Sequence, residues 1–288
     1  MKWFFCLLFP LISSAQQMTL KDQITQYLAD KKGTYAVAFK NLQSKQTVYI
    51  NEHELFHAAS TMKTPVMVEV YKQAAAGKFA VRDSILVKNE FKSIVDGSTY
   101  RLTPETDSEQ KLYTEVGQKK SIYDLMYQMI IISSNLATNI IIDLVGAEKV
   151  TKTFHQLGAK NSQIRRGVED QKAYQKGLNN EVTAYDLAEL FEKIAKGKAV
   201  NKKSSKAMIQ ILLDQKFNDI IPAKLPAGTK VAHKTGSITN IYHDSGIVYL
   251  PDGRSYVIVL LSRDWDTREN AIQTMATISE IVYQGLKR

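Results

Sequence analysis

The stretch Ser60-Thr61-Met62-Lys63 decides how this 288-residue sequence is interpreted. It follows Ala58-Ala59 and precedes an apolar segment that begins at Pro65, so the serine lies where a loop enters a buried helix. Pro65 fits only near the start of that helix, because proline lacks an N–H group and its ring clashes with the preceding turn. Residues three apart share one helix face, so we expect the Ser60 hydroxyl and the Lys63 amine to come within hydrogen-bonding distance.

This first motif has the elements of a nucleophile and its base. A serine hydroxyl is a weak nucleophile that needs a base, and a lysine can be that base only when burial or nearby cations lower its pKa. Ser60 at a helix start would also have free backbone N–H groups near it to hold an oxyanion. A helix cap followed by a surface lysine explains the same four residues without catalysis. The motif therefore needs support from elsewhere in the chain.

A second motif, Ser133-Ser134-Asn135, interrupts the strongly apolar region formed by residues 129–132 and 140–142. A turn between two buried helices would explain the interruption. Polar side chains inside such a core nevertheless need hydrogen-bond partners, and a catalytic cleft provides them. We expect Ser133 to pass a proton to a leaving nitrogen and Asn135 to orient Lys63 and a substrate amide.

A third motif, Lys234-Thr235-Gly236-Ser237, lies at the end of a predicted strand. Alternation of side chains along the strand places Lys234 and Gly236 on one side, so the ammonium reaches the site and the glycine leaves room for a substrate backbone. Lys234 and Thr235 are suited to binding a carboxylate, and the charge of Lys234 would help to keep Lys63 neutral. A basic strand end followed by a turn is the structural alternative.

The local patterns place these motifs in a chain that begins and ends with strands. Helices are predicted at 19–30, 67–76, 121–132, 138–144, 147–157, 184–195 and 267–286, strands at 34–40, 47–50, 230–234, 246–250 and 255–262, and a loop at 101–120. Strand-rich ends that bracket a helical middle indicate an α/β fold, with an antiparallel sheet flanked by terminal helices and an inserted all-helical domain. We predict a discontinuous α/β domain, residues 16–60 plus 218–288, and a helical domain, residues 61–217, with the active site between them.

The first 15 residues have the pattern of a cleaved secretory signal. Lys2 supplies the positive start, an apolar run covers residues 3–12, and Ser13-Ser14-Ala15 forms the small-residue cleavage site. A membrane anchor is the rival interpretation, but the apolar run is about half of the ~20 residues that a spanning helix needs. The only cysteine, Cys6, would leave with the signal. We expect a secreted or periplasmic protein without a disulfide and without stable membrane insertion.

The formal net charge of +9 raises the question of a nucleic-acid partner. The basic residues are scattered along the chain and do not form the clustered patch that nucleic-acid binding requires. A basic surface also suits an anionic small substrate or the cell wall. We therefore expect a monomer that binds a small molecule or a cell-wall peptide, with no nucleic acid, cofactor or metal.

With the three motifs in this order, about 70 and about 100 residues apart, the chain resembles the class A β-lactamases and related penicillin-recognising serine hydrolases. The resemblance includes the signal, the order of strands and helices, and the Pro251-Asp252-Gly253 turn after the third motif. It implies acylation of Ser60 by a β-lactam, followed by hydrolysis of the acyl-enzyme. It also implies an oxyanion hole formed by the backbone N–H groups of Ser60 and Ser237.

The chain departs from the family pattern at two places. The family's second motif usually reads Ser-Asp-Asn, whereas the middle residue here is Ser134. The family's deacylating glutamate lies in a Glu-x-x-Leu-Asn pattern, whereas in the corresponding stretch, 165–180, Glu169 is followed by Asp170-Gln171-Lys172-Ala173. Glu169 is the candidate base for deacylation. A cell-wall D-Ala-D-Ala carboxypeptidase, a broader serine hydrolase and a non-turnover penicillin-binding or sensor protein stay open as alternatives.

One further pattern, His53-Glu54-Leu55-Phe56-His57, has the H-E-x-x-H spacing of zinc proteases. That spacing binds zinc when a helix places both imidazoles on one face. Only nine residues separate the predicted strand end at Ile50 from Ser60, which leaves little room for such a helix, and the other histidines are distant in sequence. We expect His53 and His57 to be loop residues.

Overall fold

Five antiparallel strands in the order β2-β1-β11-β10-β9 form the main sheet of the computed structural model, which describes residues 18–286. They are β1 (Thr34–Asn41), β2 (Thr47–Ile50), β9 (Lys230–Ile238), β10 (Ile241–Tyr249) and β11 (Ser255–Arg263). Because β1 pairs with β11, the two ends of the chain meet in one sheet. The predicted signal, with Cys6, lies outside the described residues.

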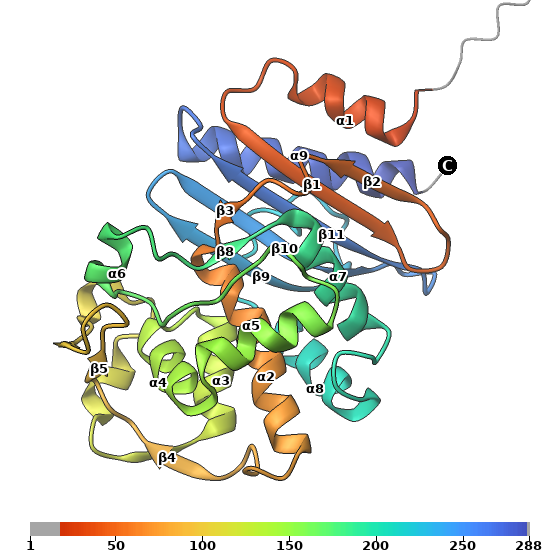
Figure 1. Ribbon diagram of the computed structural model, residues 1–288. Helices are drawn as coiled ribbons and strands as arrows, with labels where there is room; N and C mark the ends of the chain where they lie inside the picture. The colour runs from red at the N-terminus through yellow and green to blue at the C-terminus, as the bar shows by residue number, and fades with distance from the viewer. Residues whose placement is uncertain (1–17, 287–288) are drawn as a thin grey trace, which may run out of the picture.

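The terminal helices α1 (Leu20–Leu28) and α9 (Arg268–Gly285) lie together over one face of this sheet (Figure 1). Their buried residues Ile24, Met275 and Ile278 belong to the same hydrophobic cluster as Val37 and Phe39 of β1. Side chains alternate between the faces of a strand, and this places the neighbouring small residues of β1 in the other cluster. The sheet therefore separates two hydrophobic cores.

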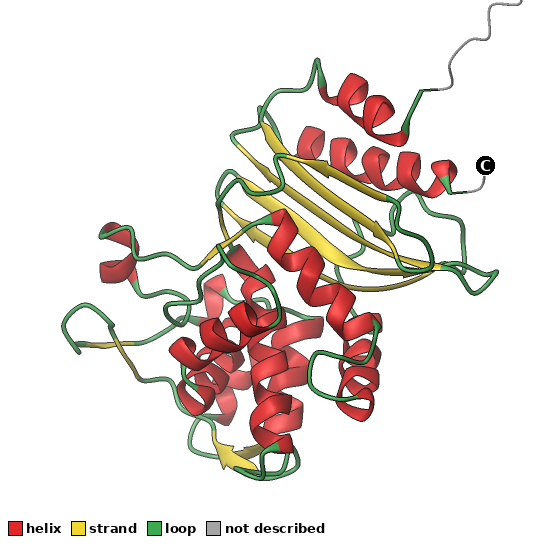
Figure 2. Ribbon diagram, turned by 45° about the vertical axis from the view of Figure 1, so that its right-hand side comes forward, coloured by secondary structure: helices red, strands yellow, loops and turns green. Residues whose placement is uncertain are grey.

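The remaining helices lie on the opposite side of the sheet (Figure 2). They are α2 (Lys63–Ala75), α3 (Ile122–Ile131), α4 (Asn135–Val145), α5 (Ala147–Gln156), α6 (Gln171–Gln175), α7 (Ala184–Ala195) and α8 (Lys202–Leu213). Helix α7 packs on β1, β10 and β11, and α8 packs on β9. Between residues 18 and 286, no helix combines the length and apolar character needed to cross a bilayer.

The structure confirms the predicted α/β fold class and most of the predicted helices and strands. Strands β9 and β10 are longer than predicted and continue through the third motif. The predicted loop at 101–120 contains two short 3₁₀ helices, η2 (Pro104–Thr106) and η3 (Lys111–Glu115). Three short strand pairs were not predicted: β3 (Phe56–His57) with β8 (Glu181–Val182), β4 (Ser84–Leu86) with β7 (Lys119–Ser121), and β5 (Phe91–Lys92) with β6 (Thr99–Tyr100).

Candidate active site

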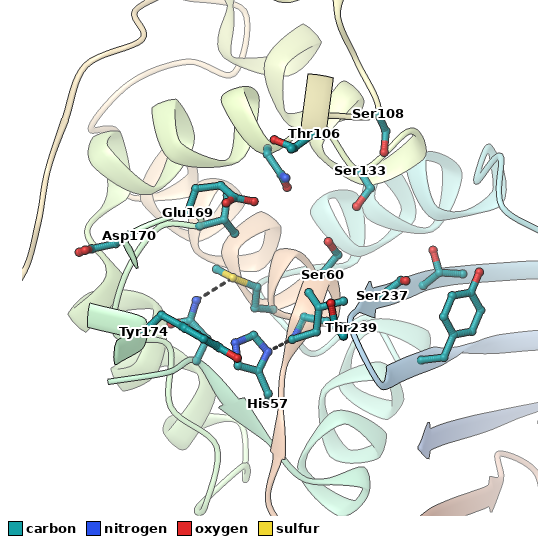
Figure 3. Close-up of a pocket in the computed structure, with 18 of the residues that line it drawn as sticks. His57, Ser60, Thr106, Ser108, Ser133, Glu169, Asp170, Tyr174, Ser237 and Thr239 are labelled. Atoms are coloured by element: carbon teal, nitrogen blue, oxygen red, sulfur yellow. Dashed lines mark hydrogen bonds between the residues drawn. The ribbon is translucent and has the colours of Figure 1, made fainter. Parts of the chain in front are cut away.

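A cavity of about 710 Å³ lies where the edge strand β9 meets the helical layer. It is lined by six of the predicted site residues, which come from distant parts of the chain (Figure 3): Ser60, Ser133, Asn135, Glu169, Thr235 and Ser237. The remaining three, Lys63, Lys234 and Gly236, are buried directly behind this lining. The fold therefore brings all three motifs and the candidate glutamate to one place.

Ser60 lies in η1 (Ala59–Met62), a short 3₁₀ helix that leads directly into α2. The preceding residue, Ala59, has a φ of 44°, which is a left-handed conformation that residues other than glycine rarely adopt. Ser60 is half buried and faces the cavity. Pro65 is the third residue of α2, a position where its missing N–H group removes no helical hydrogen bond.

Gly236 in β9 lies directly against the backbone of η1. A Cβ at this position would come within 3.1 Å of the backbone nitrogens of both Ser60 and Thr61. The side on which a Cβ would project is therefore filled by the nucleophile's own chain, whereas the sequence predicts room for a substrate backbone. The glycine is needed because strand and nucleophile pack backbone to backbone.

Lys63 is completely buried at the start of α2. Its Nζ donates to the carbonyl oxygen of Ser133 at 2.7 Å, to Asn135 Oδ1 at 2.9 Å and to Ser133 Oγ at 3.2 Å. Burial lowers the pKa of Lys63 to about 7, although the charges of Asp107 and Glu169 oppose the shift. A large fraction of the amine is therefore neutral at neutral pH, as a general base must be.

The predicted hydrogen bond between Ser60 and Lys63 is not formed. The three bonds of the Lys63 amine all go to the second motif. Ser60 belongs to a 3₁₀ turn and Lys63 to the α-helix that follows, so the two side chains do not share the face of one regular helix. Catalytic hydrogen bonds are often absent or long without substrate, so the two groups can still act as nucleophile and base.

Lys234 lies on the other side of Ser133. Its Nζ donates to Ser133 Oγ at 3.1 Å and to the carbonyl oxygen of Thr235 at 2.9 Å. Burial, followed by repulsion from Lys63, holds the pKa of Lys234 well below its ordinary value, while Asp244 opposes this shift. The hydroxyl of Ser133 thus bridges two buried amines, so it is placed to relay a proton between neighbouring groups.

A buried hydrogen-bonded pair lies next to Lys234 in β9 and β10. His233 Nδ1 is 2.9 Å from Asp244 Oδ1, and both side chains are completely buried. Asn218 donates its Nδ2 to the carbonyl oxygen of Gln215, which directs Asn218 Oδ1 toward His233 Nε2 at 3.1 Å. Both ring nitrogens of His233 therefore have a side-chain hydrogen-bond partner.

The second motif adopts a strained turn between α3 and α4. Ser133 has a φ of 60°, again in the left-handed region. Ser134 is completely buried and its hydroxyl accepts the backbone N–H of Ala137 at 3.2 Å, so it caps the start of α4. Asn135 is the first residue of that helix, and its Oδ1 points to Lys63.

Glu169 lines the cavity across from the first motif (Figure 3), and its φ of 61° is also left-handed. Its neighbours on both sides are anchored. Val168 donates its N–H to Asn139 Oδ1 at 2.7 Å, and its carbonyl oxygen accepts Asn139 Nδ2 at 3.0 Å. Asp170 accepts the Ser93 hydroxyl at 2.9 Å and the Ile94 N–H at 3.0 Å. The backbone that carries Glu169 is therefore fixed by contacts with α4 and with the 93–94 turn.

Residues 18–286 contain six residues other than glycine with a positive φ, and three of them line this one cavity: Ala59, Ser133 and Glu169. Such conformations cost about 1–3 kcal/mol each and persist only where the surroundings enforce them. All three lie around one cavity. The surrounding contacts therefore hold these residues in unfavourable backbone conformations that place their side chains at the site.

The rim of the cavity next to β9 carries a positive charge. Arg268, at the start of α9, is exposed, and its guanidinium lies 4.7 Å from the centre of the Tyr242 ring and donates to the Tyr242 hydroxyl at 2.8 Å. Thr235, Ser237 and Arg268 line the same cavity. An arginine beside hydroxyl groups is suited to binding a carboxylate.

The histidines of the H-E-x-x-H pattern have separate surroundings. His57 is in β3, and its Nδ1 accepts the Ala59 N–H at 3.0 Å. Burial, with a smaller contribution from Arg166, lowers the pKa of His57 to about 4. His53 is exposed and its ring lies 4.9 Å from that of Tyr185. Within residues 18–286, no group of three or more His, Cys, Asp or Glu side chains is arranged to hold a metal ion.

Sequence reasoning missed Asn139 and Arg268 as residues of the site. Asn139 contacts a loop 29 residues later in the chain, and Arg268 reaches the cavity only because α9 begins beside β10. Neither residue belongs to a short motif. For Asn139, the sequence does offer one signal: it is a polar residue within an apolar helix. A buried polar side chain needs a hydrogen-bond partner.

Known proteins are similar to this chain over most of its length. A family model described as "Beta-lactamase enzyme family" matches residues 19–286. A protein of Bacteroides uniformis named "Beta-lactamase" is 27% identical, over 95% of this chain and 93% of its own length. "Extended-spectrum beta-lactamase PER-1" of Pseudomonas aeruginosa is 25% identical, over 93% of this chain and 87% of its own length.

Among solved structures, a mutant of PBP-A in an acyl-enzyme complex with penicillin G superposes with a TM-score of 0.80. It is 26% identical, and the match covers 93% of this chain and 96% of that one.

Proposed function

Because the chain belongs to the beta-lactamase enzyme family, we propose that it hydrolyses β-lactam rings as a class A-like serine enzyme, through an acyl-enzyme on Ser60. The observation that carries the proposal is the buried Lys63 amine, whose pKa of about 7 suits a base, between Ser60 and the second motif. A surface lysine after a helix cap would be exposed and charged, so the structure disfavours that alternative.

In the acylation step, the Ser60 oxygen attacks the carbonyl carbon of the lactam while neutral Lys63 accepts the hydroxyl proton. The C–N bond of the ring then breaks. The nitrogen receives a proton from the Ser133 hydroxyl, which is replenished from Lys63 at 3.2 Å. The proton taken from Ser60 thus ends on the leaving nitrogen, and the ring is opened with Ser60 as an ester.

Two groups of contacts hold the substrate. The backbone N–H groups of Ser60 and Ser237 form the oxyanion hole that stabilises charge developing on the carbonyl oxygen. Thr235 and Arg268 bind the carboxylate of the substrate, with Lys234 contributing its charge from behind. Asn135 binds the substrate amide in addition to orienting Lys63.

In the deacylation step, Glu169 accepts a proton from a water molecule that attacks the ester carbon. The bond between that carbon and the Ser60 oxygen then breaks, the Ser60 oxygen takes up the proton, and the opened β-lactam leaves as a carboxylic acid. The Glu169 side chain faces the cavity, and Asn139 and Asp170 hold the backbone on both sides of it. Asn180, which also lines the cavity, donates its amide to Met62 Sδ and to the carbonyl oxygen of Arg166. We assign the activation of water to Glu169.

A direct test mixes the purified protein with penicillin G, follows the intact mass, and maps the adduct by peptide digestion. We expect a transient increase by the mass of one penicillin on the peptide that contains Ser60, and none in Ser60→Ala. An adduct on another residue, or an equal adduct in Ser60→Ala, would contradict the assignment of the nucleophile.

A second candidate function is a penicillin-binding protein that forms the acyl-enzyme and does not release it. The departure of the Glu169 loop from the family pattern is the observation that favours it, together with the similarity to the PBP-A acyl-enzyme complex. A stable adduct without turnover would support this candidate. Turnover of D-Ala-D-Ala peptides but not of β-lactams would instead support a cell-wall carboxypeptidase.

We further propose that the protein is exported after removal of residues 1–15 and acts as a monomer. The cavity lies between the proposed α/β domain, 16–60 plus 218–288, and the proposed helical domain, 61–217, since its lining comes from both. N-terminal sequencing and native mass of the protein recovered from the periplasm or medium test these statements. A retained leader or a stable dimer would contradict them.

A further inference from the structure

Asp107 is a buried carboxylate in the loop between η2 and η3, and only 6% of its surface is exposed. Four donors surround it. The N–H of Asn135 lies 3.0 and 2.9 Å from its two oxygens, and the N–H of Leu136 is 2.9 Å from Oδ2. The Tyr113 hydroxyl donates to Oδ2 at 2.9 Å and the Glu109 N–H to Oδ1 at 3.1 Å. A carboxylate can satisfy all four donors, whereas an amide offers one oxygen.

The second motif itself supplies no carboxylate, because Ser134 stands where the related enzymes usually have aspartate. The Ser134 hydroxyl is directed to the Ala137 N–H and caps the helix there. The first N–H groups of α4 need acceptors as well, since a helix start leaves four of them without a helical partner. Asp107, 28 residues before Asn135, accepts two of them.

Asp107 is connected to Lys63, the proposed base, through Asn135. Its backbone N–H is held by Asp107, and its side-chain Oδ1 accepts the Lys63 amine at 2.9 Å. Charged hydrogen bonds of this kind are about twice as strong as neutral ones. A fixed Asn135 leaves Lys63 with one orientation, in which the amine faces Ser133.

We propose that Asp107 is the positioning residue of this active site, which holds Asn135 against Lys63 and provides from another loop the carboxylate that the second motif lacks. This inference rests on the proposed function. Asp107 touches neither substrate nor nucleophile, so it acts through Asn135. Tyr113 supports Asp107 in turn.

The first test compares Asp107→Asn with Glu105→Gln, a matched control in which the changed carboxylate is exposed in the same loop. Acylation of Ser60 by a chromogenic cephalosporin should fall about 10- to 100-fold in Asp107→Asn, mainly through the acylation rate constant and with little change in substrate affinity. Glu105→Gln should stay within about 2-fold. An unchanged Asp107→Asn enzyme would overturn the proposal. Tyr113→Phe, a milder change that removes one donor, should lower the same rate about 2- to 5-fold.

The second test is rescue by relocation of the carboxylate. Ser134→Asp alone should be harmful, because it brings two carboxylates to one helix start. The double variant Ser134→Asp with Asp107→Asn should recover acylation to within about 5-fold of the original protein. A merely structural role of Asp107 in its own loop would leave the double variant as impaired as Asp107→Asn, and that outcome would overturn the proposal.

A third readout needs no substrate. Three charged groups interact with the Lys63 amine: Asp107 and Glu169, which favour its protonated form, and Lys234, which lies on the other side of Ser133. Removal of the Asp107 charge should shift the titration of Lys63, followed by NMR of ¹³C-labelled lysine, toward lower pH. An unmoved titration would overturn the proposal even if the original protein were never acylated. If the original protein were not acylated but the titration of Lys63 did shift in the Asp107 variant, only the proposed function would be contradicted.

Discussion

Asn135 and Asn139 lie one turn apart on α4. Asn135 contacts Lys63, and Asn139 contacts the loop that carries Glu169. Oδ1 of Asn135 accepts the Lys63 amine at 2.9 Å, and Asn139 binds the N–H and carbonyl oxygen of Val168 at 2.7 and 3.0 Å, beside Glu169. Residues four apart on a helix face the same way. One helix therefore holds both Lys63, the proposed base for acylation, and the loop that carries Glu169, the proposed base for deacylation.

Asn139→Leu should slow deacylation more than acylation. The change leaves the N–H of Val168 without its partner, at a cost of about 1–3 kcal/mol, and leaves its carbonyl oxygen only the 3.3 Å contact with the Tyr100 hydroxyl, so the Glu169 loop shifts. Pre-steady-state kinetics with intact-mass detection should show an accumulated acyl-enzyme. Tyr100→Phe removes only the long 3.3 Å contacts of its hydroxyl with Asn139 and with the Val168 carbonyl oxygen, so its effect on deacylation should be smaller. Equal losses in both steps would refute this division of roles.

Glu169→Gln should reduce the deacylation rate about 100-fold or more while acylation stays within about 5-fold, because only the second step needs a base for water. Single-turnover and steady-state rates separate the two steps. Gln171→Ala serves as the control, since its 3.4 Å contact with Glu169 is weak. If both rates fall together, or neither falls, Glu169 is not the base.

The acylation rate should fall as the pH decreases below about 7. The pKa of Lys63 is lowered to about 7, so the neutral amine is present above this pH and is protonated below it. The acylation rate, measured by stopped flow from pH 5 to 9, should fall about tenfold for each unit below the apparent pKa. Lys63→Arg, which cannot lose its proton, should be about 10²- to 10⁴-fold slower at all of these pH values. A flat profile in the original protein would exclude Lys63 as the base.

Arg268→Gln should weaken substrate binding with little effect on the chemical step. The guanidinium lies on the cavity rim beside Tyr242, where it can bind a carboxylate that stays ionised throughout the reaction. We expect about a 10-fold rise in KM for carboxylate-bearing β-lactams and less than a 3-fold change in kcat. Arg254→Gln, in the turn before β11, controls for net charge. A lower kcat with unchanged KM would place Arg268 in the chemistry instead.

Asp244→Ala should lower the free energy of unfolding by about 1–3 kcal/mol, because it leaves the buried Nδ1 of His233 and the buried N–H of Ile221 without their acceptor. Urea unfolding monitored by circular dichroism measures the loss. Asp252→Ala removes an exposed carboxylate and should change stability by less than about 0.5 kcal/mol. A loss in Asp244→Ala no larger than that in Asp252→Ala would mean that these buried hydrogen bonds do not stabilise the fold.

The three motifs could be found in the sequence because their chemistry requires particular residues at short spacing. Ser60 and Lys63, for example, are three residues apart, and the alternation in β9 directs Lys234 to the same side as Gly236. The helix α7 was predicted with the bounds that the structure shows, since its apolar periodicity is regular.

The remaining parts of the site depend on contacts between segments that are distant in sequence. Asp107 meets Asn135 across 28 residues, and Asn139 meets Val168 across 29. Gly236 was predicted to leave space for substrate, but the neighbouring η1 backbone fills the side on which a Cβ would project. No local pattern reports which loop will pack against which helix, so these contacts required the structure.

The most direct test of the central claim is hydrolysis of a chromogenic cephalosporin in large excess over the purified mature protein, with Ser60→Ala measured beside it. We expect many turnovers per protein molecule, a transient acyl-enzyme in the intact mass, and loss of both in Ser60→Ala. Undiminished hydrolysis by Ser60→Ala would contradict the proposed nucleophile. One equivalent of product followed by a stable adduct would contradict a hydrolase and favour a penicillin-binding protein.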